Sequence, residues 1–190
     1  MPGKQAKLLK NHDIYDLLRR VGKGRYPARD RVIVLLSLKA GLRAAEIAKL
    51  TWPMVTEPDG RVGLVISLQD AVAKKGSGRT IPLHPALRAA LVRLRRDSPG
   101  GPVIVSERGG AMRPSSIVNW FAIRYRKLGL DGCSSHSGRR TFVTRAARLV
   151  FRAGGSLRDV QQLAGHKSID QTQAYIEGDT RVKRRLVAML

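Results

Sequence analysis

Residues 163–177 read LAGHKSIDQTQAYIE, a stretch in which a helix-ending glycine, a histidine and a tyrosine follow one another. Gly165 closes a run of helical period, and His166 comes directly after it. Ser168 with a glutamine three residues later is a capping-box pattern, so it predicts a short helix that bears Tyr175. The stretch therefore predicts a histidine in a tight turn and a tyrosine on the next helix.

Three stretches further upstream carry polar residues of the same kind. His136 and Arg139 are three residues apart at the start of a predicted helix, so they face the same side. Arg43 follows a glycine and opens a short helix. Lys74 comes just before a glycine-rich turn between two predicted strands. The stretches are GLRAAEIAKLTW (41–52), KKGSGRTIPL (74–83) and HSGRRTFVTRAA (136–147).

Helical patterning surrounds one β-rich segment. A first helix ends at Gly22, and Pro27 opens a second that runs to Gly41. Residues 54–83 instead hold the β-branched runs VGLVIS and RTIPL between turn-forming residues, which predicts an antiparallel sheet of about three strands. We therefore expect an α+β fold that is mainly helical, with a small three-stranded antiparallel sheet inserted among the helices. Further helices are expected at residues 85–96, 116–128, 136–150 and 157–164.

The chain is strongly basic, with 36 Lys and Arg against 14 Asp and Glu and a formal net charge of +22. The basic residues are spread through core-forming segments, which indicates a basic folded surface. A polyanionic partner makes such self-repulsion easier to tolerate. Nucleic acid is the leading candidate, since each phosphate contact releases counterions. RNA and an anionic membrane surface are the rival partners.

Cysteine usage and hydropathy predict the compartment. The single cysteine, Cys133, excludes an internal disulfide and fits a reducing cytoplasm, where it is expected to be a small filler rather than a catalytic thiol. The longest apolar run, residues 32–38, is far too short to span a bilayer, and the N-terminus lacks the apolar region of a signal peptide. We therefore expect a cytoplasmic, nucleoid-associated protein with no membrane partner.

Two arginines, a lysine, two histidines and a tyrosine would together make a phosphate site. Guanidinium groups clamp non-bridging phosphate oxygens, and histidine and lysine move protons near neutral pH. Each residue alone is more often a solvated, capping or core residue. Only their joint order and spacing favours the functional interpretation. The six candidates are Arg43, Lys74, His136, Arg139, His166 and Tyr175.

The four stretches resemble, in the correct order, the conserved boxes of the tyrosine recombinase (phage integrase) family. Gly-Leu-Arg with a glutamate three residues on is similar to the first box, and a lysine eight residues before Pro-Leu is similar to the β-hairpin segment. His-x-x-Arg is similar to the second box, and Leu-x-Gly-His followed by Thr and Tyr to the closing segment. The match runs from Gly41 to Tyr175. It implies the catalytic fold of that family and a site-specific DNA recombinase.

The resemblance implies how the reaction proceeds. Tyr175 attacks the scissile phosphate, forms a 3′-phosphotyrosyl link and frees a 5′-hydroxyl, and a second 5′-hydroxyl then reverses the step on another strand. Arg43 and Arg139 hold the non-bridging oxygens in the transition state. The resemblance requires no metal and no cofactor. It also implies a homotetramer on DNA, which we expect to be a monomer when free.

The remaining site residues have supporting roles by the same resemblance. Lys74 protonates the leaving 5′-oxygen, and the spacing to Pro-Leu favours it over Lys75. His136 assists proton transfer at the nucleophile, and His166 hydrogen-bonds the phosphate. Glu46 orients the site, against the alternative that it is only a helix-surface ion pair.

Two features depart from the family pattern. Gly138 stands where the second box usually has a leucine, and a glycine within a helix is expected to weaken local packing. Most relatives also carry a separate helical DNA-binding domain before the catalytic one. Here we expect residues 1–25 to be a basic helical part of the same domain, residues 26–190 to be the catalytic domain, and the separate domain to be absent.

Two other functions compete with a recombinase. A type IB topoisomerase shares the nucleophile and the phosphate clamp but relaxes supercoils, and the close spacing of His166 and Tyr175 favours the recombinase. A non-catalytic basic nucleic-acid-binding module predicts the loss of at least one catalytic position, and all are present. The recombinase interpretation covers integration, excision, inversion and dimer resolution, and it is typical of a mobile genetic element.

Overall fold

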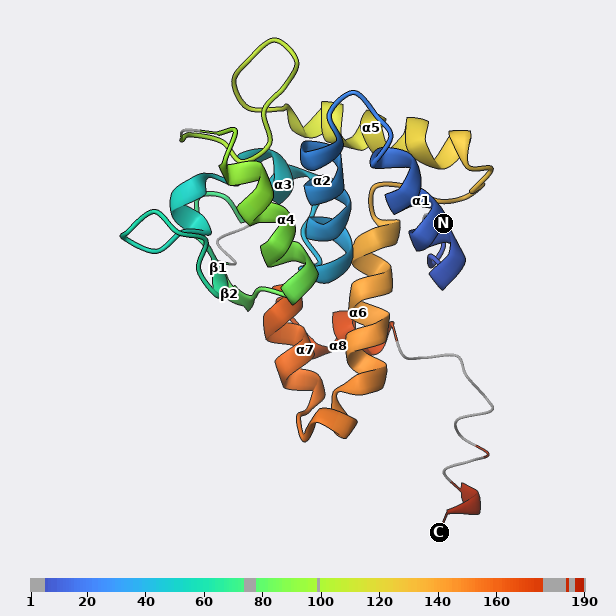
Figure 1. Cartoon of the computed structure of the whole chain (residues 1–190). Helices are drawn as coiled ribbons and strands as arrows, with labels where there is room; N and C mark the ends of the chain where they lie inside the picture. The colour runs from blue at the N-terminus through green and yellow to red at the C-terminus, as the bar shows by residue number, and fades with distance from the viewer. Residues whose placement is uncertain (1–5, 74–77, 99, 176–183, 185–186, 190) are drawn as a thin grey trace.

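A computed structural model describes the chain except for residues 1–5, 74–77, 99, 176–183, 185–186 and 190. In the described part, helices of moderate length form the body of the fold, and a two-stranded sheet lies at one side of them (Figure 1). Two short 3-10 helices, Trp52–Met54 and Phe151–Ala153, join longer elements. The elements are α1 (Asn11–Val21), α2 (Pro27–Lys39), α3 (Ala44–Lys49), β1 (Val65–Leu68), β2 (Arg79–Pro82), α4 (Pro85–Arg95), α5 (Pro114–Lys127), α6 (Ser137–Leu149), α7 (Leu157–Ala164) and α8 (Ile169–Gln173).

Helix α2 is the centre of the main core. Pro27 occupies its first turn, as expected, and every residue from Val32 to Leu38 is buried. A helix that is apolar on all sides must be covered on all sides, and α1, α3, α4 and α6 pack around it. Its C-terminal end leads into Arg43, so this packing fixes the position of the first candidate site residue.

The β-sheet has two strands in the described part of the chain, where three were expected. Strands β1 and β2 are antiparallel, with Val65 opposite Pro82. The segment that could supply a third strand forms only a single bridge, Thr56 to Val62. It is too short for a strand because the 3-10 helix Trp52–Met54 precedes it and the turn through Gly60 follows at once.

A second, smaller cluster lies between α6 and α7 and includes Val143, Ala147 and Val160. The expected capping box of α7 is present, since the Ser156 backbone N–H donates to the Asp159 carboxylate at 2.7 Å. The helix also ends where expected. In Figure 1, α7 and α8 lie at one end of the molecule and α5 crosses the other.

The end of α8 differs from the sequence-based expectation. The helix ends at Gln173, so Tyr175 lies just after it rather than on it. Its backbone N–H donates to the Thr172 carbonyl at 3.1 Å, which is turn geometry, and its ring packs back on His166. Helix α6 likewise begins at Ser137, with His136 as the residue that precedes its first turn.

The N-terminal segment packs onto the same core. Leu9, Leu17 and Val21 are buried there, and the Leu9 backbone N–H donates to the Thr141 hydroxyl at 2.9 Å. Arg140 also donates to the Ala6 carbonyl at 2.6 Å. Within the described residues, no helix has the length and apolar character needed to cross a membrane.

Candidate active site

Glu46 is buried between two arginines rather than lying on a helix surface. It occupies the third position of α3, and the backbone N–H of Arg43 donates to its carboxylate at 2.9 Å. Nη1 of Arg43 donates at 2.9 Å, and both terminal nitrogens of Arg79 donate at 3.1 Å. Burial alone would raise the pKa of the Glu46 carboxyl, but the hydrogen bond and charge of Arg79, with those of Arg43, lower it. Glu46 is therefore a carboxylate at neutral pH.

Arg139 points inward from the first turn of α6 and is 4% exposed. Its Nη1 donates to the Gly41 carbonyl at 2.7 Å, and its Nη2 to the Ala164 carbonyl at 2.7 Å. Burial, with the nearby positive charge of Arg43, lowers the pKa of Arg139 to about 10. It stays charged at neutral pH, and its guanidinium plane is fixed by two backbone carbonyls.

Two glycines allow the close approach of α6 to the rest of the site. Gly41 has a φ of +63°, and a Cβ there would collide with the Phe142 ring. A Cβ on Gly138 would collide with the Ser37 hydroxyl of α2. The glycine at this family leucine position was expected to weaken packing. In the structure, the absence of a side chain at Gly138 instead allows α6 to pack closely against α2.

His166 follows Gly165, whose φ of +61° reverses the chain after α7. Nδ1 of His166 lies 2.9 Å from the Thr172 hydroxyl, and Nε2 of Gln161 donates to the His166 carbonyl at 3.1 Å. Burial, followed by the charges of Arg139, Arg43 and Arg79, lowers the pKa of His166 to about 4. The imidazole is therefore neutral at physiological pH.

Tyr175 stacks on His166, with ring centroids 5.6 Å apart and planes inclined by 18°. Tyr175 and Arg139 line one cavity of about 210 Å³, together with His136 and Arg140. His136 is exposed at the N-terminal end of α6. A tyrosine, an arginine and a histidine therefore line the same cavity.

The structure brings most of the predicted site residues together. They are Arg43, Glu46, His136, Arg139, His166 and Tyr175. Lys74 and Lys75 lie outside the described residues. Among the described residues, no three His, Cys, Asp or Glu side chains are grouped so as to hold a metal ion. Cys133 is half-buried, and burial raises the pKa of its thiol.

Sequence reasoning missed three residues that hold the site. Arg79 binds Glu46, Thr172 contacts the His166 ring, and Gln161 holds the His166 backbone. A signal for Arg79 was available: alternation in a strand puts it on the same face as Ile81, which is 1% exposed. A charged residue on a buried face needs a charged partner.

The chain matches the family model described as the phage integrase family over residues 7–181. It belongs to the phage integrase family. It is 30% identical to tyrosine recombinase XerC of Brucella suis, over 81% of this chain and 48% of that protein. It is 31% identical to tyrosine recombinase XerC of Nitrobacter winogradskyi, over 84% of this chain and 50% of that protein. The chain spans about half the length of these curated relatives.

Solved structures of this family share the fold. The Tn1549 transposon integrase, in complex with a circular intermediate DNA, matches with a TM-score of 0.75 and 18% identity over 99% of this chain and 66% of that one. The XerA recombinase matches with a TM-score of 0.71 and 22% identity over 100% of this chain and 65% of that one. The mainly helical α+β fold expected from the sequence is thereby confirmed.

Proposed function

We propose that this chain is the catalytic part of a site-specific DNA recombinase, which cleaves and rejoins strands through a 3′-phosphotyrosyl intermediate. The observation that carries the proposal is the stacking of Tyr175 on a neutral, buried His166 beside the fixed guanidinium of Arg139. A tyrosine with a fixed cation and a neutral imidazole next to it suits nucleophilic attack on a phosphodiester.

The proposed chemistry is a phosphoryl transfer with no net hydrolysis. The Tyr175 oxygen attacks the scissile phosphorus, the bond from phosphorus to the 5′-oxygen breaks, and that oxygen leaves as a hydroxyl after taking a proton from Lys74. The Tyr175 proton passes to His136, which lines the same cavity. Attack by another 5′-hydroxyl on the phosphotyrosine reverses the step and joins a new strand, so no energy cofactor is consumed.

Arg43 and Arg139 neutralise charge on the non-bridging oxygens as the transition state forms. Both side chains are oriented before substrate arrives, Arg43 by the Glu46 carboxylate and Arg139 by the carbonyls of Gly41 and Ala164. Donors held in place in this way need no reorganisation during the reaction. Glu46 acts through Arg43 and is a positioning residue in this proposal.

His166 serves as a neutral hydrogen-bond donor. Its lowered pKa keeps a single proton on the ring. When the Thr172 hydroxyl donates to Nδ1, that proton lies on Nε2 and is free to bond a phosphate oxygen. Thr172 is fully buried, so its contact with Nδ1 holds the His166 ring in this orientation.

Double-stranded DNA is the proposed partner, and four protomers on two duplexes the proposed active assembly, formed from free monomers. The net charge of +22 supports the first part. Residues 26–190 are proposed as the catalytic domain, with residues 1–25 part of it, and the cytoplasmic nucleoid as its location.

A strand-transfer assay separates the candidate functions. The substrate is a duplex with a nick near the cleavage site, which traps the covalent complex, together with a second labelled duplex that offers a 5′-hydroxyl. A recombinase joins the label to the cleaved strand. A type IB topoisomerase relaxes supercoiled plasmid without exchanging partners, and a binding module forms no covalent product with either substrate.

A further inference from the structure

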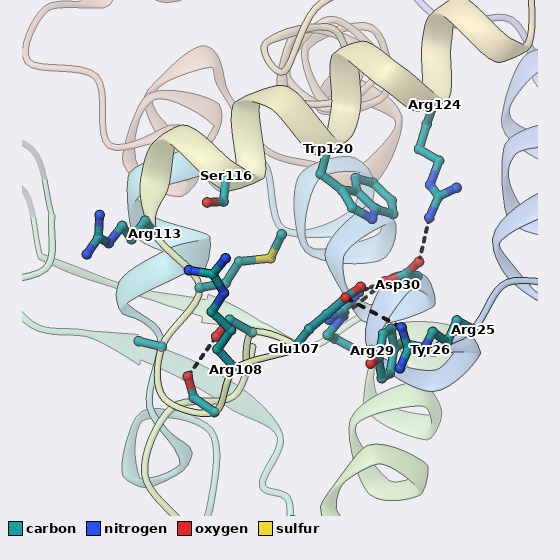
Figure 2. Close-up of a pocket in the computed structure, with 14 residues that line it drawn as sticks. Arg25, Tyr26, Arg29, Asp30, Glu107, Arg108, Arg113, Ser116, Trp120 and Arg124 are labelled. Carbon is teal, nitrogen blue, oxygen red and sulfur yellow. Dashed lines mark hydrogen bonds and ion pairs between the residues drawn. The ribbon is translucent and has the colours of Figure 1, made fainter.

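A large pocket lies away from the candidate active site, among α5, the first turn of α2 and the loop formed by residues 106–113 (Figure 2). Its volume is about 640 Å³. Arg29 stands at the N-terminal end of α2, whereas Arg43 follows the C-terminal end. At the rise of an α-helix, the helical part from Arg29 to Lys39 alone spans about 15 Å. The pocket is therefore distinct from the cavity that Tyr175 lines.

Arginines dominate the lining of this pocket. Five of them face two acidic side chains, so the lining has a net charge of +3. They come from three separate parts of the chain, which meet only in the folded protein (Figure 2). The arginines are Arg25, Arg29, Arg108, Arg113 and Arg124, and the acids are Asp30 and Glu107.

Asp30 is already saturated by two of these arginines. It is 1% exposed and accepts hydrogen bonds from Arg29 at 2.8 Å and from Arg124 at 3.1 Å. The Arg29 guanidinium also lies 4.3 Å from the centroid of the Tyr26 ring. Arg29 and Arg124 are thus held rigidly, and they also present positive charge at the pocket wall.

The outer arginines have no such partner. Arg108 and Arg113 are exposed at the rim, and no carboxylate of the described residues forms an ion pair with either. Their positive charge is therefore available to a ligand.

Buried donors in the same wall lack acceptors. Trp120 is 8% exposed, and its indole nitrogen has no hydrogen-bond partner, nor does Nε of Arg124. In Figure 2 the indole nitrogen points toward the pocket and Asp30. A buried donor without an acceptor is costly, so a ligand rich in acceptor oxygens would relieve that cost on entering.

We propose that this pocket binds a phosphate group. A phosphate carries negative charge and acceptor oxygens on all sides, which matches converging guanidinium groups and an unpaired indole N–H. Under the function proposed above, on which this step rests, a backbone phosphate of DNA flanking the cleavage site supplies it. A free nucleotide would supply the same chemistry.

The two tryptophans of the chain provide the test. In the isotope-labelled full chain bearing Tyr175→Phe, the two indole N–H signals are followed by NMR, and Trp120→Phe assigns them. Trp52 is the internal reference, because its indole donates to Ser98 at 3.3 Å outside the pocket. The probes are a duplex of about 20 base pairs, a dinucleotide and inorganic phosphate. The Trp120 signal should shift on binding while the Trp52 signal stays.

A charge-matched pair of variants shows whether the pocket causes the shift. Arg108→Ala with Arg113→Ala should weaken the Trp120 response about tenfold at physiological salt. Arg148→Ala with Arg152→Ala removes the same charge from exposed positions that do not line the pocket, and it should have a much smaller effect.

The three probes distinguish a phosphate of the DNA backbone from a free ligand. A shift with duplex alone assigns the phosphate to the DNA backbone, and a shift with dinucleotide or phosphate at similar concentration assigns it to a free ligand. The proposal that this pocket binds phosphate is overturned if no probe shifts the Trp120 signal. It is also overturned if the two double variants weaken the Trp120 response equally. Formation of the covalent complex by the wild-type chain is measured in a separate assay. A failure of the recombinase proposal is therefore distinguished from a failure of the pocket proposal.

Discussion

The guanidinium of Arg79 donates to both carboxylate oxygens of Glu46, at 3.1 Å for each. Its Nε donates to the Leu163 carbonyl at 2.9 Å. One side chain, only 6% exposed, therefore ties β2 to α3 and to the end of α7. It holds the Glu46 carboxylate that also binds Arg43, and it joins the β1–β2 hairpin to the end of α7, just before the turn that carries His166.

Arg79→Lys should destabilise the chain by about 3 kcal/mol, because a lysine cannot bond two carboxylate oxygens and a carbonyl at once. Urea unfolding measures this change. At a temperature where the variant is fully folded, covalent complex formation should still be slower, while DNA affinity stays the same. Arg61→Lys is the control, since its ion pair with Asp59 is exposed and screened by water, and it should change stability much less. Covalent complex formation by folded Arg79→Lys at the wild-type rate would contradict the positioning role.

Lys74→Ala should slow strand cleavage severely, and a substrate with a 5′-thio leaving group, which needs no proton, should restore it. Lys75→Ala should mainly weaken DNA binding in a salt-dependent manner. The lysine eight residues before the Pro-Leu pair is Lys74, and that spacing favours it over Lys75. Rescue of Lys75→Ala by the thio-substrate would show that the other lysine is the general acid.

Stability should depend on pH through His166. Its folded-state pKa of about 4 lies below the ordinary value of 6.5, so between these values the unfolded chain takes up a proton that the folded chain does not. Stability is therefore retained above about pH 6.5 and lost as pH falls toward about 4. Wild type should lose roughly 2 kcal/mol more than His166→Gln over that range in denaturant unfolding. Parallel losses in both proteins would show that His166 is not held neutral.

Deleting residues 184–190 should preserve cleavage at a single site and reduce pairing of two sites. Val187 and Met189 are 70% and 84% exposed, and exposed apolar side chains of this kind often mark a contact. A contact that passes from each protomer to the next closes into a ring. Native gel shifts with one-site and two-site DNA measure the difference. A lower melting temperature of the free protein with unchanged pairing would mean that the tail packs on its own domain.

Local patterns predicted the helices well where the start and stop signals are themselves local. Pro27 begins α2, and the Ser156 cap and Gly165 end define α7, because each signal acts within a few residues. The third strand and the placement of Tyr175 on a helix were wrong. The expected third strand is cut short by the 3-10 helix Trp52–Met54 and the turn at Gly60, and Tyr175 leaves the helix where its ring packs back on His166.

The residues of the candidate site also differ in how far the sequence could predict them. Residues that meet a phosphate could be named from their chemistry and spacing, because few residue types suit that task. Their long-range partners could not. Arg79 acts on Glu46 across 33 positions and Arg139 on Gly41 across 98, and no local pattern contains such partners. Gly138 was misread for the same reason, since its value depends on Ser37 of another helix.

The most direct test of the account is the identity of the residue that becomes bonded to DNA. Wild-type chain is incubated with the nicked trapping substrate, the covalent complex is digested with protease, and the peptide attached to the 3′-phosphate is sequenced by mass spectrometry. The account predicts the peptide that contains Tyr175, with the phosphate on that tyrosine, and no covalent complex with Tyr175→Phe although that variant binds DNA equally well. A phosphate on any other residue, or a Tyr175→Phe protein that still becomes bonded to DNA, would contradict it.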